Sequence, residues 1–234
     1  MNLGDPGLVE AISPEDFLAL VDDRRDFHVP TVEIKRDSKK VRVPYVPAVR
    51  SWANTTGITL HQTACDLGES LERYDTIGSQ WSITRSGKKR WHCDNNRIVY
   101  AANGFNNRTV SIEVNGLYAG DEARRLETTW DNPATKKRET PQDVTEESMI
   151  ALRMVCRFIC WDVMRHGGRI KFILAHRQSS GSRENDPGSE IWQRAAVPLL
   201  AELGLSDGGA NFKVDDGNPI PECWDATRHK GVRY

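Results

Sequence analysis

The sixteen residues ILAHRQSSGSRENDPG, numbered 173–188, hold the most informative pattern in this 234-residue chain. The apolar run KFILA (171–175) predicts a buried strand, and His176 follows it directly. A Gly- and Ser-rich loop then leads to Asp186, ten positions further on, with Pro187 and Gly188 behind it. Such a loop is flexible enough to fold back, so His176 and Asp186 could both reach one ion.

Four segments upstream of this stretch are rich in β-branched and aromatic residues, which is typical of strands. They are ITLHQTA (58–64), QWSITR (80–85), RIVYAA (97–102) and TVSIEV (109–114). Turn-forming residues separate them, in SGKK (86–89), CDNN (93–96) and NGFNNR (103–108). The sequence therefore predicts a sheet in which His61 and Glu113 lie near strand ends.

Helical signals surround these strands. Thr145 predicts the start of a helix, apolar residues then recur at helical spacing, and Gly167-Gly168 predicts its end. The segment 191–205, IWQRAAVPLLAELGL, predicts a closing helix that Pro198 must kink or restart. Residues 119–143 are polar and contain prolines, so they predict a long surface loop.

We expect one main domain with an extension at each end. The N-terminal extension, residues 1–56, would hold a short helix capped by Ser13 and then, over 26–56, an irregular wrap or edge strand. Residues 57–205 would form the domain. The Gly- and Pro-rich residues 206–234 would pack on it as a C-terminal tail.

Bulk composition narrows the choice of partners. A formal net charge of -1 and a pI near 6.6 do not favour nucleic acid as a partner. No apolar run approaches the length that spans a bilayer, so we expect no membrane insertion. The N-terminus has no secretory signal pattern, which predicts synthesis in the cytoplasm without a signal peptide. The five cysteines are an odd number and contain no C-x-x-C pair, which predicts free thiols.

The two histidines admit a structural and a functional interpretation. A histidine between apolar neighbours must find a partner, because an unpaired buried polar ring costs about 1 to 3 kcal/mol. A backbone carbonyl is the commoner partner, so His61 or His176 taken alone would be structural. Together with Asp186 they form a set of two imidazoles and one carboxylate, which leaves zinc a fourth, catalytic position for water.

These segments, in this order, resemble the type 2 N-acetylmuramoyl-L-alanine amidases. That family includes amidase-type phage lysozymes, muropeptide-recycling amidases and peptidoglycan recognition proteins. The resemblance covers about residues 58–205 and rests on LHQT (60–63), WSITRSGKK (81–89), SIEVNG (111–116), the long helix and the final H-x(9)-D-P-G. It implies an α/β fold with a central mixed β-sheet flanked by helices, and a metal in an open groove at one edge.

The resemblance also implies roles for individual residues. His61, His176 and Asp186 would bind Zn²⁺, and Glu113 would orient and deprotonate the attacking water. The substrate would be peptidoglycan, cut at the amide bond between N-acetylmuramic acid and L-alanine. We expect the protein to act as a monomer.

Two positions depart from the family pattern. Many members carry a lysine two residues before the third metal ligand, but Glu184 stands here with Arg183 beside it. Either Arg183 assists the developing oxyanion instead, or another cation does, or turnover is slower. The family often has a histidine on the second strand, where this chain has Gln80 and Trp81 as candidate substrate contacts.

The loop before the Glu113 strand offers further candidate substrate contacts, namely Asn103, Phe105, Asn106 and Asn107. Their amides could bind the stem peptide or a sugar, although turn formation explains the asparagines equally well.

The leading hypothesis is an endolysin that is made in the cytoplasm and acts on the cell wall after release through a holin pore. A second hypothesis for an enzyme is a cytoplasmic muropeptide-recycling amidase. The alternative that is not an enzyme is a non-catalytic peptidoglycan-binding protein. Asp186 argues against that alternative because the third ligand is present, whereas Glu184 argues mildly for it.

Overall fold

The computed structural model describes residues 12–26, 28, 30–132, 136–225 and 234. Residues 1–11, on which the expectation of no signal peptide largely rests, lie outside the described part, and so do residues 226–233 of the predicted tail.

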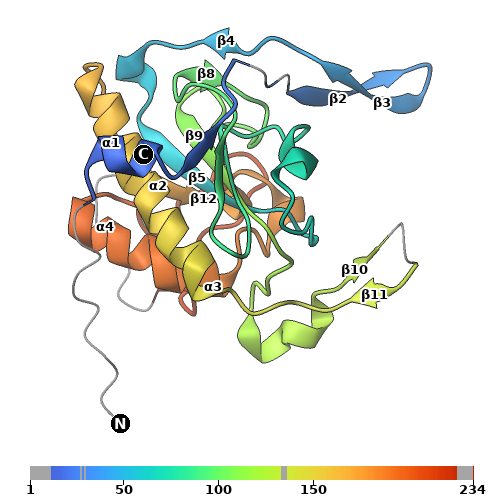
Figure 1. The fold of residues 1–234 in the computed structure, drawn as a ribbon. Coiled ribbons are helices and arrows are strands. Elements are labelled where there is room, and N and C mark those ends of the chain that lie inside the picture. The colour runs from blue at the N-terminus through green and yellow to red at the C-terminus, as the bar shows by residue number, and fades with distance from the viewer. Residues whose placement is uncertain (1–11, 27, 29, 133–135, 226–233) are drawn as a thin grey trace.

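A six-stranded mixed sheet forms the centre of the protein (Figure 1), in the order β1-β7-β6-β9-β5-β12. Four neighbouring pairs (β1–β7, β6–β9, β9–β5 and β5–β12) are parallel, whereas β6 and β7 are antiparallel. The strands are β1 (Val21–Asp23), β5 (Gly57–Gln62), β6 (Trp81–Ile83), β7 (Lys89–Trp91), β9 (Thr109–Val114) and β12 (Phe172–Ala175). The predicted fold class, an α/β protein with a central mixed sheet, is confirmed.

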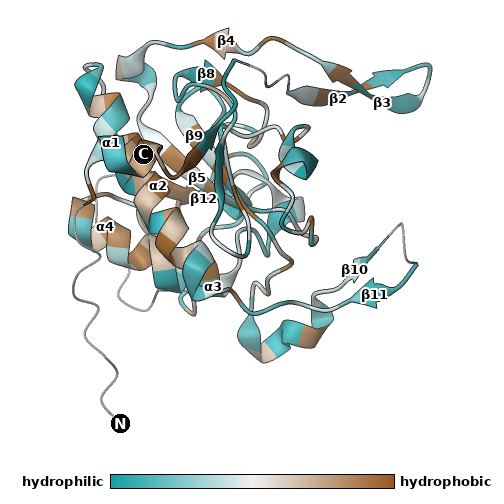
Figure 2. Cartoon of the chain, in the orientation of Figure 1, coloured by the Kyte–Doolittle hydropathy of each residue, from teal (hydrophilic) through white to brown (hydrophobic). Residues whose placement is uncertain are grey.

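Helices cover one face of this sheet. They are α1 (Pro14–Leu18), α2 (Glu146–Arg165), α3 (Ser189–Ile191) and α4 (Val197–Leu203). Their apolar side chains join those of β5, β6 and β9 in the main core, whereas Phe172 and Leu174 of β12 pack on the other side with Phe212 and Val214. Figure 2 shows apolar and polar residues alternating along α2 and α4, as expected for helices with one buried face. No helix in the described part of the chain is both long and apolar enough to cross a membrane.

The predicted helices are confirmed. Thr145 caps α2, because its side chain accepts a hydrogen bond from the amide of Ser148. The helix ends just before Gly167, whose φ of 83° lies in the left-handed region that favours glycine. The closing helix begins as α3, passes through a π-helical turn (Trp192–Ala196) and continues as α4, which has Pro198 in its first turn. Pro198 thus restarts the helix, as its missing N–H requires.

The predicted strand at 97–102 is largely wrong. Only β8 (Arg97–Ile98) is extended, and it pairs with β4 (Ala48–Val49) in a small sheet of its own. The side-chain oxygen of Asn106 accepts hydrogen bonds from the amides of Ala101 and Ala102, so this segment turns rather than joining the central sheet. The central sheet instead contains β7, which begins at the end of the SGKK turn and was not among the four segments predicted as strands.

The N-terminal segment is more regular than predicted. Residues 26–56 were expected to form an irregular wrap or edge strand, but β2 (Thr31–Arg36) and β3 (Lys39–Pro44) form an antiparallel hairpin. Asp37 and Ser38 at its turn have φ values of 49° and 64°, the left-handed conformation of a tight hairpin turn. The segment 119–143 also contains a short hairpin, β10 (Trp130–Asp131) with β11 (Arg138–Glu139). In Figure 1 both hairpins project toward the right-hand side of the molecule.

All five cysteines are free, as the sequence predicts, and none of them lies in the candidate metal cluster described below. The division into residues 1–56, 57–205 and 206–234 stays a prediction.

Candidate metal centre and active site

The register of the sheet brings the two histidines together. Strands β5 and β12 are parallel neighbours in which Leu60 lies opposite Ala175, so the residues that follow them, His61 and His176, are adjacent. Their Nδ1 atoms lie 3.0 Å apart. Nδ1 of His176 also lies 2.9 Å from Oδ2 of Asp186. One candidate ligand atom from each of His61, His176 and Asp186 therefore lies within 4.8 Å of the other two.

The backbone around Asp186 holds its carboxylate in place. The amide of Gln62, the residue after His61, donates to Oδ1 of Asp186 over 3.0 Å. The side-chain amide of Gln62 donates to the carbonyl of Tyr118 over 3.0 Å, which ties the end of β5 to the segment after β9. The amide of Arg177 donates to the carbonyl of Asp186 over 3.0 Å. The loop from His176 to Asp186 thus closes on itself, as the sequence predicts.

The chemistry of these three side chains fits a divalent cation. All three residues are buried, and burial lowers the pKa of His61 well below its usual value, with His176 and Arg183 adding to the effect. Neutral imidazole is the form that binds metals. Nδ1 of His176 lies within hydrogen-bond distance of both His61 and Asp186, but it carries at most one proton and cannot donate fully to both. A cation among the three groups would instead accept a lone pair from each. Two imidazoles and a carboxylate match a catalytic zinc site.

Glu113 lies beside this cluster. It is opposite His61 in the parallel pairing of β5 and β9, with Oε1 4.0 Å from Nδ1 of His61. Its other carboxylate oxygen has no hydrogen-bond partner in the described part of the chain. Burial raises the pKa of Glu113 well above its usual value, Asp186 raises it further, and Arg183 opposes the shift. A carboxyl group with a raised pKa and a free oxygen is suited to proton transfer.

Arg183 and Glu184 are adjacent in the sequence but differ in the cavities that they line. Arg183, at the end of a short 3₁₀ turn (Gly181–Arg183), lines the same cavity as Glu113, and its charge acts on both Glu113 and His61. The side chain of Glu184 does not line that cavity but neighbouring depressions, one of them together with Arg124 and Arg177. Glu184 therefore lies outside the cavity that Glu113 lines, whereas Arg183 is a cation that does reach the site.

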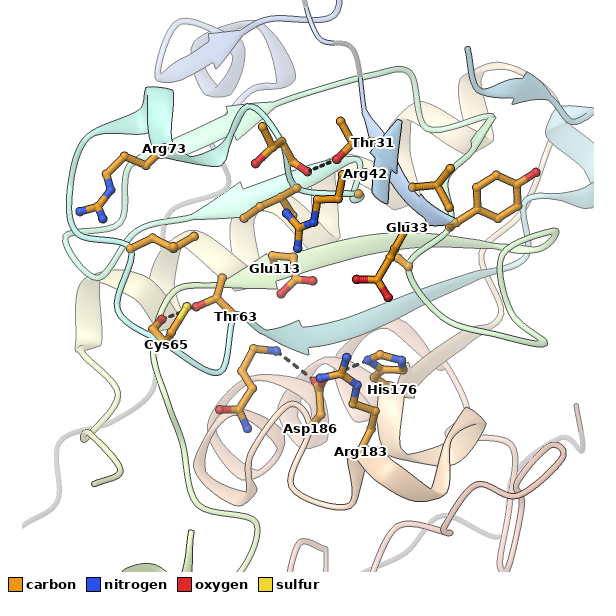
Figure 3. Close-up of a pocket in the computed structure, with 18 residues that line it drawn as sticks. Thr31, Glu33, Arg42, Thr63, Cys65, Arg73, Glu113, His176, Arg183 and Asp186 are labelled. Atoms are coloured by element: carbon orange, nitrogen blue, oxygen red, sulfur yellow. Dashed lines mark hydrogen bonds and ion pairs between the residues drawn. The ribbon is translucent and has the colours of Figure 1, made fainter. Parts of the chain in front are cut away.

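A cavity of about 490 Å³ opens over the cluster (Figure 3). Glu113, His176, Arg183 and Asp186 line one part of it. Its other walls come from the β2–β3 hairpin and from two loops, at 63–67 and 73–78. The hairpin residues Thr31, Val32, Glu33 and Arg42 were not predicted from the sequence, because they lie outside the stretch that resembles the family. The sequence predicted only an irregular wrap or edge strand over residues 26–56, and nothing in that segment indicated a neighbouring site.

The structure places the predicted substrate contacts Gln80 and Trp81 in the core. Trp81 is fully buried and donates its indole N–H to Asn95 over 2.8 Å. Gln80 is also fully buried, and its side chain bridges the carbonyl of Arg97 and the amide of Ser111. Neither side chain reaches the cavity, because each satisfies its polar atoms within the core.

The loop residues before β9 also lie outside the cavity. Phe105 is buried in the second apolar cluster, and the side-chain oxygen of Asn106 accepts from the amides of Ala101 and Ala102, so the structure brings neither side chain into the cavity. Asn103 and Asn107 are exposed elsewhere on the surface, and their contact with substrate stays a prediction.

A mixed sheet brings two histidines together at adjoining strand ends, and a loop adds Asp186 to them, beside the carboxyl group of Glu113. This arrangement defines a candidate single-metal site of the hydrolytic kind. The family model described as N-acetylmuramoyl-L-alanine amidase matches residues 51–189, more than half of the chain. The protein belongs to this N-acetylmuramoyl-L-alanine amidase family.

Several solved structures are similar to this chain. The endolysin N-acetylmuramoyl-L-alanine amidase LysCS from Clostridium intestinale URNW has a TM-score of 0.47 and 16% identity, covering 70% of this chain and 94% of its own. Bumblebee PGRP-SA has a TM-score of 0.45 and 11% identity, covering 76% and 92%. Drosophila PGRP-LB has a TM-score of 0.46 and 14% identity, covering 80% and 96%. No curated protein sequence is significantly similar to this chain.

Proposed function

We propose that this protein is a zinc-dependent N-acetylmuramoyl-L-alanine amidase, which hydrolyses the amide bond between the lactyl group of N-acetylmuramic acid and L-alanine in peptidoglycan. The family match supports this reaction. The observation that carries the proposal is the convergence of His61, His176 and Asp186 within 4.8 Å, with Glu113 on the adjoining strand. Zinc bound by these three residues would supply a Lewis acid for the scissile carbonyl and lower the pKa of a water molecule to about 7.

Glu113 carries the proton transfers. Its carboxylate accepts a proton from the attacking water, whose oxygen forms the new bond to the lactyl carbonyl carbon. The carboxyl group then donates that proton to the nitrogen of L-alanine as the C–N bond breaks. The raised pKa of Glu113 favours this double role, because the group can hold the proton between the two steps.

Arg183 stabilises charge on the substrate. Negative charge develops on the carbonyl oxygen during attack, and a guanidinium group beside the cavity offsets it. Glu184 cannot oppose this effect closely, since its side chain lines other depressions. We therefore assign to Arg183 the part that a lysine plays in many relatives.

The intact donor set favours catalysis over binding alone. A recognition protein that only binds peptidoglycan needs neither three convergent ligand atoms nor a free carboxyl oxygen beside them, and this chain has both. We propose that the protein degrades the cell wall as an endolysin, with muropeptide recycling as the alternative setting. A preference for intact sacculi over soluble anhydro-muropeptides would separate the two.

The reaction can be tested by digesting purified sacculi and identifying the products by mass spectrometry, with and without a chelator. We expect free L-alanine amino termini to appear only when the chelator is absent. New reducing sugar ends, or cleavage within the peptide, would instead identify a different hydrolase. Cleavage that persists in chelator after the metal has been removed would contradict the metal-dependent mechanism.

A further inference from the structure

The β2–β3 hairpin lies outside the family-matched residues 51–189 and yet forms one wall of the cavity. Thr31, Glu33 and Arg42 line this wall, opposite the part that holds Glu113, His176 and Arg183. An element outside the family-matched residues thus lies beside the proposed reaction centre.

Contacts at its base fix the hairpin in this position. The hydroxyl of Thr31 donates to the carbonyl of Thr76 over 3.2 Å. The amide of Tyr45 donates to the carbonyl of Pro30 over 3.0 Å, and its hydroxyl accepts from the amide of Tyr100 over 3.0 Å. The rings of Tyr45 and Tyr100 also pack together, with centroids 5.0 Å apart. Both ends of the hairpin are therefore attached to the body of the protein.

The antiparallel register determines which hairpin side chains face the cavity. Glu33 and Arg42 are directly opposite one another on β2 and β3, so their side chains project from the same face. Figure 3 shows Arg42 extending from the hairpin toward Glu113.

Arg42 is an available cation. Glu33 pairs with Lys40 over 2.7 Å, and the structure gives the guanidinium of Arg42 no hydrogen bond or ion pair within the described residues. An exposed arginine is often simply solvated. Arg42 differs because it lies on the wall of a cavity that we assign to an anionic substrate.

We propose that Arg42 is a substrate-binding residue that pairs with a free carboxylate of the peptidoglycan stem peptide, and that the β2–β3 hairpin thereby selects among stem peptides. This inference rests on the proposed amidase function. Stem peptides carry carboxyl groups beyond L-alanine, and these groups can be free or amidated. A guanidinium binds a carboxylate through two parallel charged hydrogen bonds, and a neutral carboxamide cannot accept both with the same strength.

The test compares two soluble muropeptides that differ only in a carboxylate or carboxamide at the stem peptide. Steady-state kinetics on the full-length zinc enzyme give kcat and KM for wild type, Arg42→Ala, Arg42→Lys and Arg36→Ala. Arg36 provides the matched control, because it lies on the same hairpin at the far end and does not line the cavity. Calorimetric binding to the full-length Glu113→Gln variant, with and without Arg42→Ala, measures affinity while turnover is slowed.

We expect Arg42→Ala to raise KM and the dissociation constant for the carboxylate ligand by about tenfold, the size of a lost charged hydrogen bond, with kcat little changed. The carboxamide ligand should be almost unaffected, Arg42→Lys should restore part of the affinity, and Arg36→Ala should match wild type. If wild type cleaves the muropeptides but Arg42→Ala leaves both unchanged, or weakens both equally, the inference about Arg42 is wrong and the amidase proposal stands. If wild type cleaves neither muropeptides nor sacculi, both proposals fail.

Discussion

His61 on β5 and Glu113 on β9 lie directly opposite one another in the parallel register of the sheet, and Nδ1 of His61 is 4.0 Å from Oε1 of Glu113. The backbone pairing of two central strands sets this separation, so it does not depend on a mobile loop. The group proposed to transfer protons is therefore held rigidly beside a group proposed to bind the metal. Proton transfer and metal binding can therefore be tested by separate substitutions.

Replacing Glu113 with glutamine should preserve zinc binding and slow hydrolysis at least about tenfold, the low end of what loss of a general base costs. Glutamine keeps the size of the side chain but cannot accept the proton. Zinc content by atomic absorption and turnover on sacculi check the two parts. Glu202→Gln provides a control, since Glu202 lies on α4 and pairs with Arg157 far from the cavity. Equal rates for Glu113→Gln and wild type would remove Glu113 from the mechanism.

Replacing Asp186 with asparagine should weaken zinc binding by at least about a hundredfold, because even groups that only support a ligand are worth about 10- to 100-fold in metal affinity. Asparagine keeps the shape of the side chain but removes its negative charge. Zinc should raise the melting temperature of wild type and have little effect on the variant, since a ligand stabilises a fold in proportion to its binding. His166→Gln, which changes a histidine outside the cluster, should retain the zinc response. A full zinc response in Asp186→Asn would contradict the proposed ligand set.

Three residues of the candidate site could be predicted from the strands that carry or precede them. His61, Glu113 and His176 lie at or just past the ends of apolar segments, and parallel strands place such ends along one edge of a sheet. The family resemblance supplied Asp186 and the order of the ligands. Most of the substrate wall could not be predicted in the same way.

Two predicted substrate contacts, Gln80 and Asn106, lie outside the cavity for the same physical reason. Gln80 and Asn106 are polar, but their amides bond to backbone groups close by, and a sequence does not reveal which partner a polar side chain will choose. The segment 97–102 has strand-forming residues, yet two of its backbone amides donate hydrogen bonds to the side chain of Asn106 instead of to a neighbouring strand. Arg42 reaches the site only because the hairpin is attached through Thr31 and Tyr45, which are contacts between distant parts of the chain.

Replacing Arg183 with alanine should lower kcat by about a hundredfold, the low end for loss of a group that stabilises an oxyanion. The effect should fall mainly on kcat, because the charge it offsets develops during the reaction. Arg183→Lys should recover part of the rate. Glu184→Gln should change kcat little, since that side chain faces other depressions. A large gain in Glu184→Gln would show that its charge does reach the reaction centre.

The stability of the metal-free protein should fall as the pH is lowered through about 6.5, the usual pKa of histidine in an unfolded chain. His92 is fully buried, with Nε2 2.8 Å from the hydroxyl of Ser82, and burial lowers its pKa well below that of free histidine. The unfolded state therefore binds the proton and the folded state does not, so acid favours unfolding. Each such histidine contributes up to about 1.4 kcal/mol per pH unit.

His92→Gln should reduce this pH dependence. Urea unfolding of wild type and variant, in chelator at pH 7.5 and 5.5, measures the difference; the wild-type loss should exceed that of the variant by up to about 1.4 kcal/mol over this range. An identical pH dependence in the two proteins would show that His92 titrates alike in both states.

Replacing Gly120 with alanine should disturb the metal site from outside it. A Cβ atom at Gly120 would overlap the side-chain oxygen of Asn185 and lie 2.8 Å from its Cα, so the backbone next to Asp186 must shift. The carbonyl of Gly120 also accepts the indole N–H of Trp224, which limits how far residue 120 can retreat. We expect a loss of about 1 to 3 kcal/mol in the free energy of unfolding, as for other overpacked sites, together with weaker zinc binding.

Gly167→Ala separates these two effects. A Cβ at Gly167 would meet no atom within 4 Å, but its φ of 83° strains any other residue. It should therefore reduce stability and leave zinc affinity unchanged, whereas Gly120→Ala should reduce both. Chemical unfolding and zinc titration of the two variants make the comparison. If Gly120→Ala binds zinc as tightly as Gly167→Ala does, then Asp186 keeps its position when Asn185 moves, and the loop is more tolerant than its hydrogen bonds to Gln62 and Arg177 indicate.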